Sequence, residues 1–420
     1  MKRLNLLIVA PFCSLLGEPY FNRFLYLAKL FSKRGHRVTL VTSSFQHFEK
    51  KQRTDIQRRL TEDGLGIKVV LIEEPGYVSN VSVRRALSHH QFTKNFATWW
   101  SDIDQEFDAV YSAYPTIGHN KLLATLKANG ALNSIFILDV QDVWPESIVS
   151  AIPSLRHIPK QWLPFSGSAD LVYRYADYVF AVSKTYLDRA LKTRNAGSGE
   201  VAYIGTDFST IGEHLRLGKV DGQVSVFYIG TLSYSYDLET VIRGIALARS
   251  RGINASLHIF GTGPHKSHLE KVSGPGVHFR GVHQFHDLID RARECDIAVN
   301  CIAKNASQSV TNKLSDYLSL GCPILNSQEN PEVLDLLRTR NFSNYEAGSA
   351  ESFLNSLEEL LESGAHLRTW EPDQRMNRDN IYPRILARVE ALVEERAGNT
   401  PSTGDHSDMT LGDFRDEEDS

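Results

Sequence analysis

Short apolar runs alternate with amphipathic stretches along most of the chain, a pattern typical of α/β proteins. Leu6–Ala10 is a continuous apolar run, a helical pattern follows from about Tyr20 to Lys33, and Arg37–Thr42 is another apolar run. This order predicts a βαβ unit, whose right-handed crossover places the loop after the first strand at the carboxyl edge of a parallel sheet. Further strands of the same sheet are expected at 67–72, 109–112, 134–140 and 178–183.

A second alternating series begins after a polar, glycine-containing stretch near 218–222, which has the composition of a linker. Two consecutive series of similar size predict two doubly wound, Rossmann-like domains that face each other across a cleft. We expect the first domain to span residues 1–208 and the second to span 209–376. Within the second, strands are expected at 224–229, 255–260, 277–279 and 297–301, and helices at 238–250 and from about 265.

The carboxyl-terminal region divides into two parts. Apolar residues recur at helical spacing from Ile381 to Val393, which predicts an amphipathic helix over 377–397. Residues 398–420 have no such periodicity, and their last sixteen positions hold seven acidic residues against one arginine. This acidic tail is expected to be disordered.

Composition narrows the class of protein. The 420 residues are 42% hydrophobic, enough to fill two cores, and the net charge of −4 argues against a nucleic-acid binder. The first apolar run is short and ends at Pro11, so it predicts a buried strand and not a signal peptide. Four scattered cysteines indicate reduced thiols of a cytosolic protein. We expect a cytoplasmic protein, at most peripheral on the inner face of the plasma membrane.

Residues 307–327 carry the clearest chemistry. A polar loop runs into a predicted helix that bears Lys313 and Asp316 near its start, followed by Gly321, Pro323 and an apolar strand. A loop that feeds a helix N-terminus suits an anion, because the first backbone N–H groups lack partners and the helix dipole is positive there. The lysine can neutralise phosphate, and the carboxylate can accept hydrogen bonds from a ribose diol.

This segment resembles the donor-nucleotide element of the family 4, GT-B-type retaining glycosyltransferases, particularly those of cell-surface polysaccharide and O-antigen assembly. The resemblance extends over roughly residues 4–396 and also rests on 138–147, 228–238 and 260–264. Members usually carry two glutamates, for which this chain has Gln308 and Asp316. The family's Arg and Lys after the second-domain glycine are replaced by residues 233–238.

The resemblance implies a GT-B fold whose last helix returns to the first domain. It implies that Lys313 carries the charge of the leaving group, Asp316 fixes the ribose and Asp142 orients the acceptor. Asp139 is expected to be structural. The 261–264 segment either borders the sugar or base or is only a strand-ending turn. The expected donor-binding residues are Gly17, Gly230, Thr231, Ser233, Gly261, Gly263, Gln308, Val310, Thr311 and Asn312.

The implied activity is transfer of a hexosyl or N-acetylhexosaminyl group from a nucleotide-diphosphate sugar to an acceptor hydroxyl with retention. Residues 45–59 and 153–166 mix basic with aromatic side chains, which suits an anionic membrane or is only a solvated basic face. The first case predicts a polyprenyl-diphosphate-linked saccharide as acceptor.

Two other functions remain open at this point, a nucleotide-sugar epimerase and a catalytically silent nucleotide-sugar-binding subunit. Gln308 and the missing Arg/Lys pair motivate the second. His283 and His286 have HxxH spacing without a third ligand near in sequence. The sequence therefore predicts no metal and no cofactor.

Overall fold

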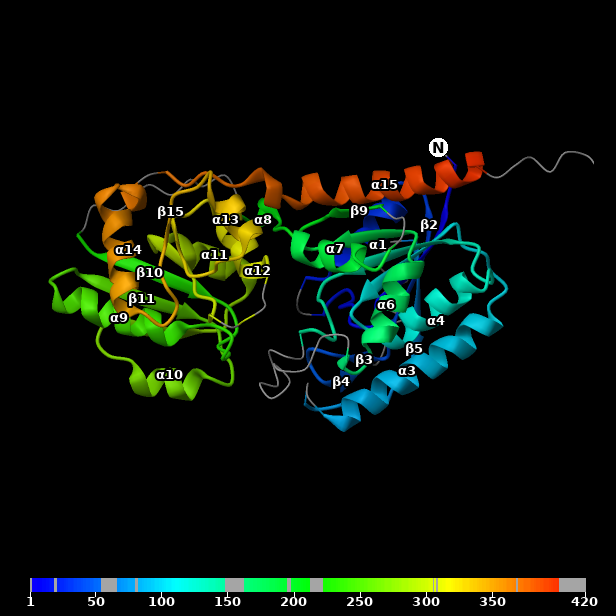
Figure 1. Ribbon diagram of the computed structural model, residues 1–420, viewed down its shortest axis with the longest axis horizontal. Coiled ribbons are helices and arrows are strands. Elements are labelled where there is room, and N and C mark those ends of the chain that lie inside the picture. The colour runs from blue at the N-terminus through cyan, green and yellow to red at the C-terminus, as the bar shows by residue number, and fades with distance from the viewer. Residues whose placement is uncertain are drawn as a thin grey trace, which may run out of the picture.

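The computed structural model shows two α/β domains side by side, joined along one edge by the last helix (Figure 1). It describes residues 2–18, 21–53, 66–79, 82–147, 162–194, 198–211, 222–304, 306, 309–367 and 369–399. Gln308, most of the acidic tail and parts of both basic-aromatic stretches therefore lie outside the described residues.

The first domain is built on a seven-stranded parallel sheet of order β5-β2-β1-β6-β7-β8-β9. Its strands are β1 (Asn5–Val9), β2 (Arg37–Ser43), β5 (Ile67–Ile72), β6 (Ala109–Tyr114), β7 (Ile135–Val140), β8 (Tyr178–Ala181) and β9 (Ser198–Val201). Its helices are α1 (Arg23–Lys33), α3 (Val83–Asp102), α4 (Ile117–Ala128), α6 (Ser166–Tyr175) and α7 (Lys184–Leu191), and β3 (Phe45–Gln46) pairs antiparallel with β4 (Lys51–Gln52).

Both faces of this sheet are buried, which explains its continuous apolar runs. Along β1, Leu6 and Ile8 enter the core beneath α1, while Leu7 and Val9 enter the core on the opposite face. Alternate side chains of a strand point to opposite faces, so one apolar run supplies both cores.

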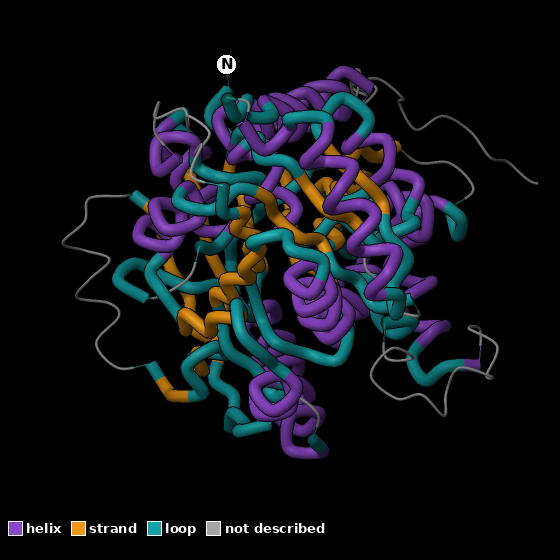
Figure 2. The backbone as a smooth tube through the Cα atoms, turned by 90° about the vertical axis from the view of Figure 1, so that its left-hand side faces the viewer, coloured by secondary structure: helices purple, strands orange, loops and turns teal. Residues whose placement is uncertain are grey.

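The second domain has a six-stranded parallel sheet of order β12-β11-β10-β13-β14-β15. Its strands are β10 (Val224–Ile229), β11 (Ala255–Phe260), β12 (Val277–Gly281), β13 (Ile297–Asn300), β14 (Ile324–Asn326) and β15 (Phe342–Asn344). Its helices are α8 (Phe208–Ile211), α9 (Leu238–Ser250), α10 (Lys266–Val272), α11 (Phe285–Arg293), α12 (Asn312–Leu320), α13 (Pro331–Leu337) and α14 (Ala350–Glu362). Figure 2 shows strands between helical layers.

The fold class predicted from the sequence is confirmed, because each domain is a doubly wound parallel sheet. In both sheets the chain starts at a central strand, proceeds to one edge and then returns to build the other side. Ligands of such folds bind beyond the carboxyl ends of the strands where the order reverses. Those ends of β1 and β10 are therefore the places to look for a site.

Helix α15 (Arg378–Asn399) leaves the second domain and packs along the first (Figure 1). Its apolar residues Ile381, Ile385, Leu386, Val389 and Val393 belong to the same core cluster as β1 and α1. Helix α15 thus forms part of the first domain's core.

Replacing Ile385 by Ala tests this packing. The side chain is 1% exposed, and deleting buried methyl groups of this kind costs about 2–5 kcal/mol. We expect a lower midpoint of the first unfolding transition in a thermal or denaturant scan. Arg384→Ala, on the exposed side of the same helix, is the matched control and should shift the midpoint little. Equal midpoints for the two variants would contradict the packing.

Candidate functional site

Two glycine loops lie in backbone contact at the carboxyl edge of the second sheet. Gly230 follows β10 and Gly261 follows β11, and the Gly230 N–H donates to the Phe260 carbonyl oxygen at 2.9 Å. A Cβ on Gly261 would lie 1.9 Å from the Gly230 carbonyl oxygen, and one on Gly263 would lie 2.3 Å from that of Leu232. Neither position accepts a side chain, so these two glycines are required for the close approach of the two loops.

Lys313 lies against these loops near the start of α12. Thr311 caps this helix, since its Oγ1 accepts the Leu314 N–H at 3.3 Å. The Lys313 side chain is 7% exposed, and a Cβ on Gly230 would lie 3.0 Å from its Cε.

The Lys313 ammonium is surrounded by aromatic groups. Nζ donates to the Tyr228 hydroxyl at 3.0 Å and lies 2.9 Å from the ring centroid of Tyr236. Within the described part of the chain it forms no ion pair with a carboxylate. Burial lowers the pKa of Lys313 to about 7, with the charge of Cys301 acting in the opposite direction. The site holds a cation whose charged form an incoming anion would stabilise.

Asp316 faces the junction between the domains. The Thr206 hydroxyl donates to its carboxylate at 2.8 Å, and Thr206 itself forms a parallel bridge with Asn377. Burial raises the pKa of Asp316 to about 6, while the Thr206 hydrogen bond and the charge of Arg378 act against this shift. This acid is thus linked to the chain segment that connects the domains.

The structure brings most of the predicted donor-binding residues together. Thr231 and Ser233 continue the Gly230 loop, where Tyr228 donates to the Thr231 carbonyl at 2.8 Å and the Ser233 and Ser235 hydroxyls are 2.9 Å apart. The adjoining residues are Val310, Thr311 and Asn312 at the start of α12 and Gly261 and Gly263 on the facing loop.

Asp142 lies in the first domain just beyond β7. Its carboxylate accepts the Val143 N–H at 2.8 Å and the Ser147 hydroxyl at 3.1 Å, and burial raises its pKa. The pKa of Tyr186 on α7 is also raised, first by burial and then by the charge of Asp142, whereas a hydrogen bond with the Ser309 backbone lowers it. Tyr186 thus reaches from the first domain to the backbone of the loop before α12, a contact that no sequence pattern indicated.

Gly17 belongs to a turn after β1 that an ion pair holds in place. The Glu18 carboxylate accepts from Nε and Nη2 of Arg53 at 2.7 and 2.8 Å, and Arg53 also donates to the Cys13 carbonyl at 2.6 Å. The Arg53 side chain is only 3% exposed. The expectation that the basic residues of 45–59 form one exposed face is therefore wrong for Arg53, because a buried carboxylate binds it.

Glu332, at the start of α13, was not identified from the sequence. Its two carboxylate oxygens each lie 2.8 Å from the Lys184 N–H, the first helical amide of α7 in the other domain. It also accepts the hydroxyls of Tyr203 at 3.0 Å and Ser309 at 3.3 Å. A carboxylate at a helix N-terminus is stabilised by unpaired amides and the helix dipole. In sequence, Glu332 resembles an ordinary acid in the first turn of a helix.

Comparison with known proteins gives this arrangement a context. Residues 223–363 match the family model described as Glycosyl transferases group 1. That match covers the second domain, including the glycine loops and Lys313. No curated protein sequence matches the chain.

Solved structures extend the likeness to both domains. Sucrose-phosphate synthase from Thermosynechococcus elongatus superposes with a TM-score of 0.63 at 12% identity, covering 94% of this chain and 100% of that one. Anabaena HepE, solved with UDP and glucose, gives 0.60 at 12%, covering 93% and 100%. The lipopolysaccharide outer core galactosyltransferase WaaB gives 0.59 at 14%, covering 93% and 99%. At these identities the likeness establishes the fold, which is the GT-B arrangement of glycosyltransferases.

Two further observations concern the described residues. None of their helices is long and apolar enough to span a bilayer. Among them, no group of three or more His, Cys, Asp or Glu side chains is placed to hold a metal ion.

The raised pKa of Asp316 predicts a pH dependence of stability. Its folded pKa of about 6 exceeds the ordinary value of 3.8, so its contribution is most favourable below about pH 4 and is lost as the pH rises through 6. Asp316→Asn should therefore raise the melting temperature by a few degrees at pH 7.5 and change it little at pH 4. Asp335→Asn, at an exposed acid of the same domain, is the control. A lower melting temperature of Asp316→Asn at pH 7.5 would contradict the burial effect.

Proposed function

We propose that this protein transfers a sugar from a nucleoside-diphosphate sugar to an acceptor hydroxyl with retention of configuration. The observation that carries the proposal is the buried Lys313 side chain beside the two closely packed glycine loops. The same residues lie in the segment that matches the glycosyl transferases group 1 model. HepE, with the same fold, was solved with UDP-glucose, which supports a nucleotide-sugar donor here.

In this mechanism the second domain stabilises the leaving group. The bond between the anomeric carbon and the phosphate oxygen breaks, its electron pair remains on the diphosphate, and Lys313 neutralises the added charge. The Gly230 loop lies against Lys313, because a residue without Cβ at position 230 leaves room for the lysine side chain. Asp316 binds the ribose hydroxyls, which requires its carboxylate to share or release Thr206.

The acceptor hydroxyl attacks the anomeric carbon from the face that the diphosphate leaves. Its proton passes to the departing phosphate oxygen, so no protein base is needed. The protein then accelerates transfer by holding the acceptor hydroxyl and the anomeric carbon in the reactive orientation. Asp142 orients the acceptor from the carboxyl end of β7.

A basic and aromatic cluster of the first domain supports an anionic, lipid-linked acceptor. Lys50 Nζ lies 4.7 Å from the Tyr77 ring centroid, and the Arg85 guanidinium lies 5.5 Å from the same ring. Burial, Lys50 and Arg85 lower the pKa of His47 to about 3, and burial and the same two cations lower that of His89 to about 4. The part of these shifts that Lys50 and Arg85 cause reflects the two cations next to the rings, and a site with two cations suits a polyprenyl-diphosphate-linked saccharide.

Exposed apolar side chains next to this cluster support peripheral contact with an anionic membrane at the inner face of the plasma membrane. Val83 and Leu87, one turn apart on α3, are 78% and 61% exposed, and Phe48 on the β3–β4 hairpin is 48% exposed. Apolar side chains beside cations are the pattern of a surface that inserts shallowly into anionic lipid. The cytoplasmic assembly of a cell-surface polysaccharide would require this placement.

Lys313→Ala should weaken UDP binding and slow transfer by about 10²–10³-fold, the usual loss for one group that stabilises a developing anion. Lys304→Ala, an exposed lysine of the same domain paired with Glu346, is the control. The measurements are calorimetric titration with UDP and release of UDP from a panel of UDP-sugars and acceptors. Unchanged affinity and turnover in Lys313→Ala would reject the assignment.

The lowered pKa of Lys313 predicts that the affinity for UDP depends on pH. Since the free lysine loses its proton above about pH 7, the affinity for UDP should fall between pH 7 and pH 9. The phosphate's own second ionisation lies near pH 6 and does not interfere in this range. The affinity of Lys313→Ala for UDP should not change over this pH range. A wild-type affinity that stays constant between pH 7 and pH 9 would contradict the prediction.

The Val83→Ser/Leu87→Ser double variant tests membrane contact. Co-sedimentation with anionic vesicles should fall relative to the wild type, and added salt should reduce wild-type binding because exposed charges are screened over about 10 Å at 0.1 M. Val282→Ser, 70% exposed in the second domain, is the control. Equal recovery of the wild type on neutral and anionic vesicles would count against the contact.

A catalytically silent nucleotide-sugar-binding subunit is the second candidate. It is favoured by the engagement of Asp316 with Thr206 and by the absence of the family's Arg/Lys pair after Gly230. UDP binding that depends on Lys313, without UDP release across the acceptor panel, would favour this candidate over a transferase.

A further inference from the structure

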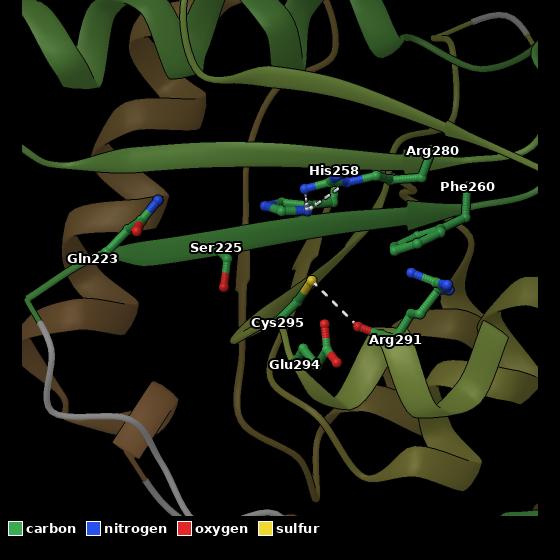
Figure 3. A pocket seen from close by; sticks show the side chains of 8 residues that line it. All are labelled: Gln223, Ser225, His258, Phe260, Arg280, Arg291, Glu294 and Cys295. Atoms are coloured by element: carbon green, nitrogen blue, oxygen red, sulfur yellow. Dashed lines mark hydrogen bonds between the residues drawn. The ribbon is translucent and has the colours of Figure 1, made fainter. Parts of the chain in front are cut away.

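A cavity of about 220 Å³ lies in the second domain, against the face of the sheet beside α11 (Figure 3). Its floor is made of side chains from β10, β11 and β12, and its wall is the last turn of α11 and the residues that follow. Ser225 lies at the start of β10, while Gly230 follows its end. Gly230 comes five positions after Ser225, which corresponds to roughly 17 Å along a strand. Most of the cavity is therefore remote from the Lys313 site.

Two arginines enter this cavity from opposite sides. Figure 3 shows Arg291 on α11 directed toward the sheet and Arg280 on β12 lying across His258. Neither guanidinium forms an ion pair with any carboxylate among the described residues. Arginine suits phosphate because its planar fork donates two parallel hydrogen bonds.

His258 fixes the position of Arg280. The guanidinium Nε and Nη2 lie 3.3 and 3.2 Å from His258 Nδ1 and donate to it, so this nitrogen carries no proton. The other ring nitrogen lies 3.3 Å from the Ser256 hydroxyl.

The remaining lining suits hydroxyl groups next to a small ring. Glu294 presents carboxylate oxygens, and the Ser225 hydroxyl donates to Asp296 at 2.6 Å, so its oxygen accepts from a ligand. Phe260 supplies an apolar face between the arginines. The volume is below the 300–1,000 Å³ typical of pockets for larger ligands, so a nucleotide is too large.

We propose that this cavity binds a small phosphate monoester bearing hydroxyl groups, in the size range of a hexose monophosphate. Arg280 and Arg291 hold the phosphate, Glu294 and Ser225 receive hydroxyls, and Phe260 packs against the ring. The site is separate from the proposed donor site and does not depend on the transferase function.

The cavity also adjoins the base of a glycine loop. Phe260 precedes Gly261 and Arg280 precedes Gly281, and the Gly261 N–H donates to the Gly281 carbonyl at 2.7 Å. A ligand held by Phe260 and Arg280 thus contacts residues that anchor the Gly261 loop.

The test is calorimetric titration of the full chain with glucose 6-phosphate, inorganic phosphate and glucose in separate experiments, each without and with saturating UDP. Glucose 6-phosphate should bind at least about tenfold tighter than either of the others, since it alone engages both the arginines and the hydroxyl acceptors. Affinity equal to that of inorganic phosphate would overturn the ligand class, and loss of binding in the presence of UDP would place the ligand in the donor site and overturn the proposal.

Variants locate the binding. Arg280→Gln and Arg291→Gln should each weaken glucose 6-phosphate binding about tenfold. Arg243→Gln, an exposed arginine of α9 on the same domain, should leave the affinity unchanged. All three side chains are at the surface, so each variant should keep the wild-type melting temperature. Wild-type affinity in both Arg280→Gln and Arg291→Gln would reject the site.

Discussion

A buried ion pair at the junction of the two domains fixes how the chain crosses between them. Arg23, the first residue of α1, donates from Nε to Asp139 at the end of β7 at 2.7 Å and from Nη1 to the Tyr203 carbonyl at 3.0 Å. Tyr382 of α15 lies over the guanidinium at 5.2 Å. Loss of one partner from a buried pair typically costs 3–5 kcal/mol, because a charge remains without compensation. The pair therefore holds the connecting segment and α15 against the first sheet. Thr206, three residues beyond Tyr203, donates a hydrogen bond to Asp316 of the second domain.

Much of the fold was predictable because parallel strands buried on both faces are continuous apolar runs. The sequence placed β10, β11 and α9 with the bounds that the structure has, and Gly321 ends α12 in the left-handed conformation expected of a helix-terminating glycine. Contacts between residues distant in sequence carry no such signal. Glu332 and Lys184 are 148 positions apart, and neither stands in a pattern that marks the other.

The candidate site was predictable in its backbone and its lysine, and not in the surroundings of that lysine. The glycines and Lys313 followed from the motif, and Lys313 was expected to carry the charge of the leaving group, whereas nothing in the sequence indicated which side chains surround it. The Ser233 and Ser235 hydroxyls lie 2.9 Å apart, and the lysine is surrounded by the rings of Tyr228 and Tyr236. The Ser-Tyr-Ser-Tyr segment that replaces the family's Arg and Lys thus supplies an aromatic environment for one cation. Lys313, which is buried and forms no ion pair with a carboxylate in the described part of the chain, therefore supplies positive charge at this edge of the sheet.

The geometry of the crossing constrains how the cleft can change shape. The chain leaves the first domain near Thr206 and returns near Asn377, and these passages pair as a parallel bridge, with the Thr206 N–H bonded to the Met376 carbonyl at 2.8 Å. Rotation of one domain against the other must pivot here, since hinges lie where few residues absorb the change. Glu332, bound to the first amide of α7, is a second tie between the domains. Because it also accepts the Ser309 hydroxyl, any movement that separates Glu332 from α7 also disturbs the loop before α12. Domain movement and the shape of the Lys313 site are thereby coupled through one carboxylate.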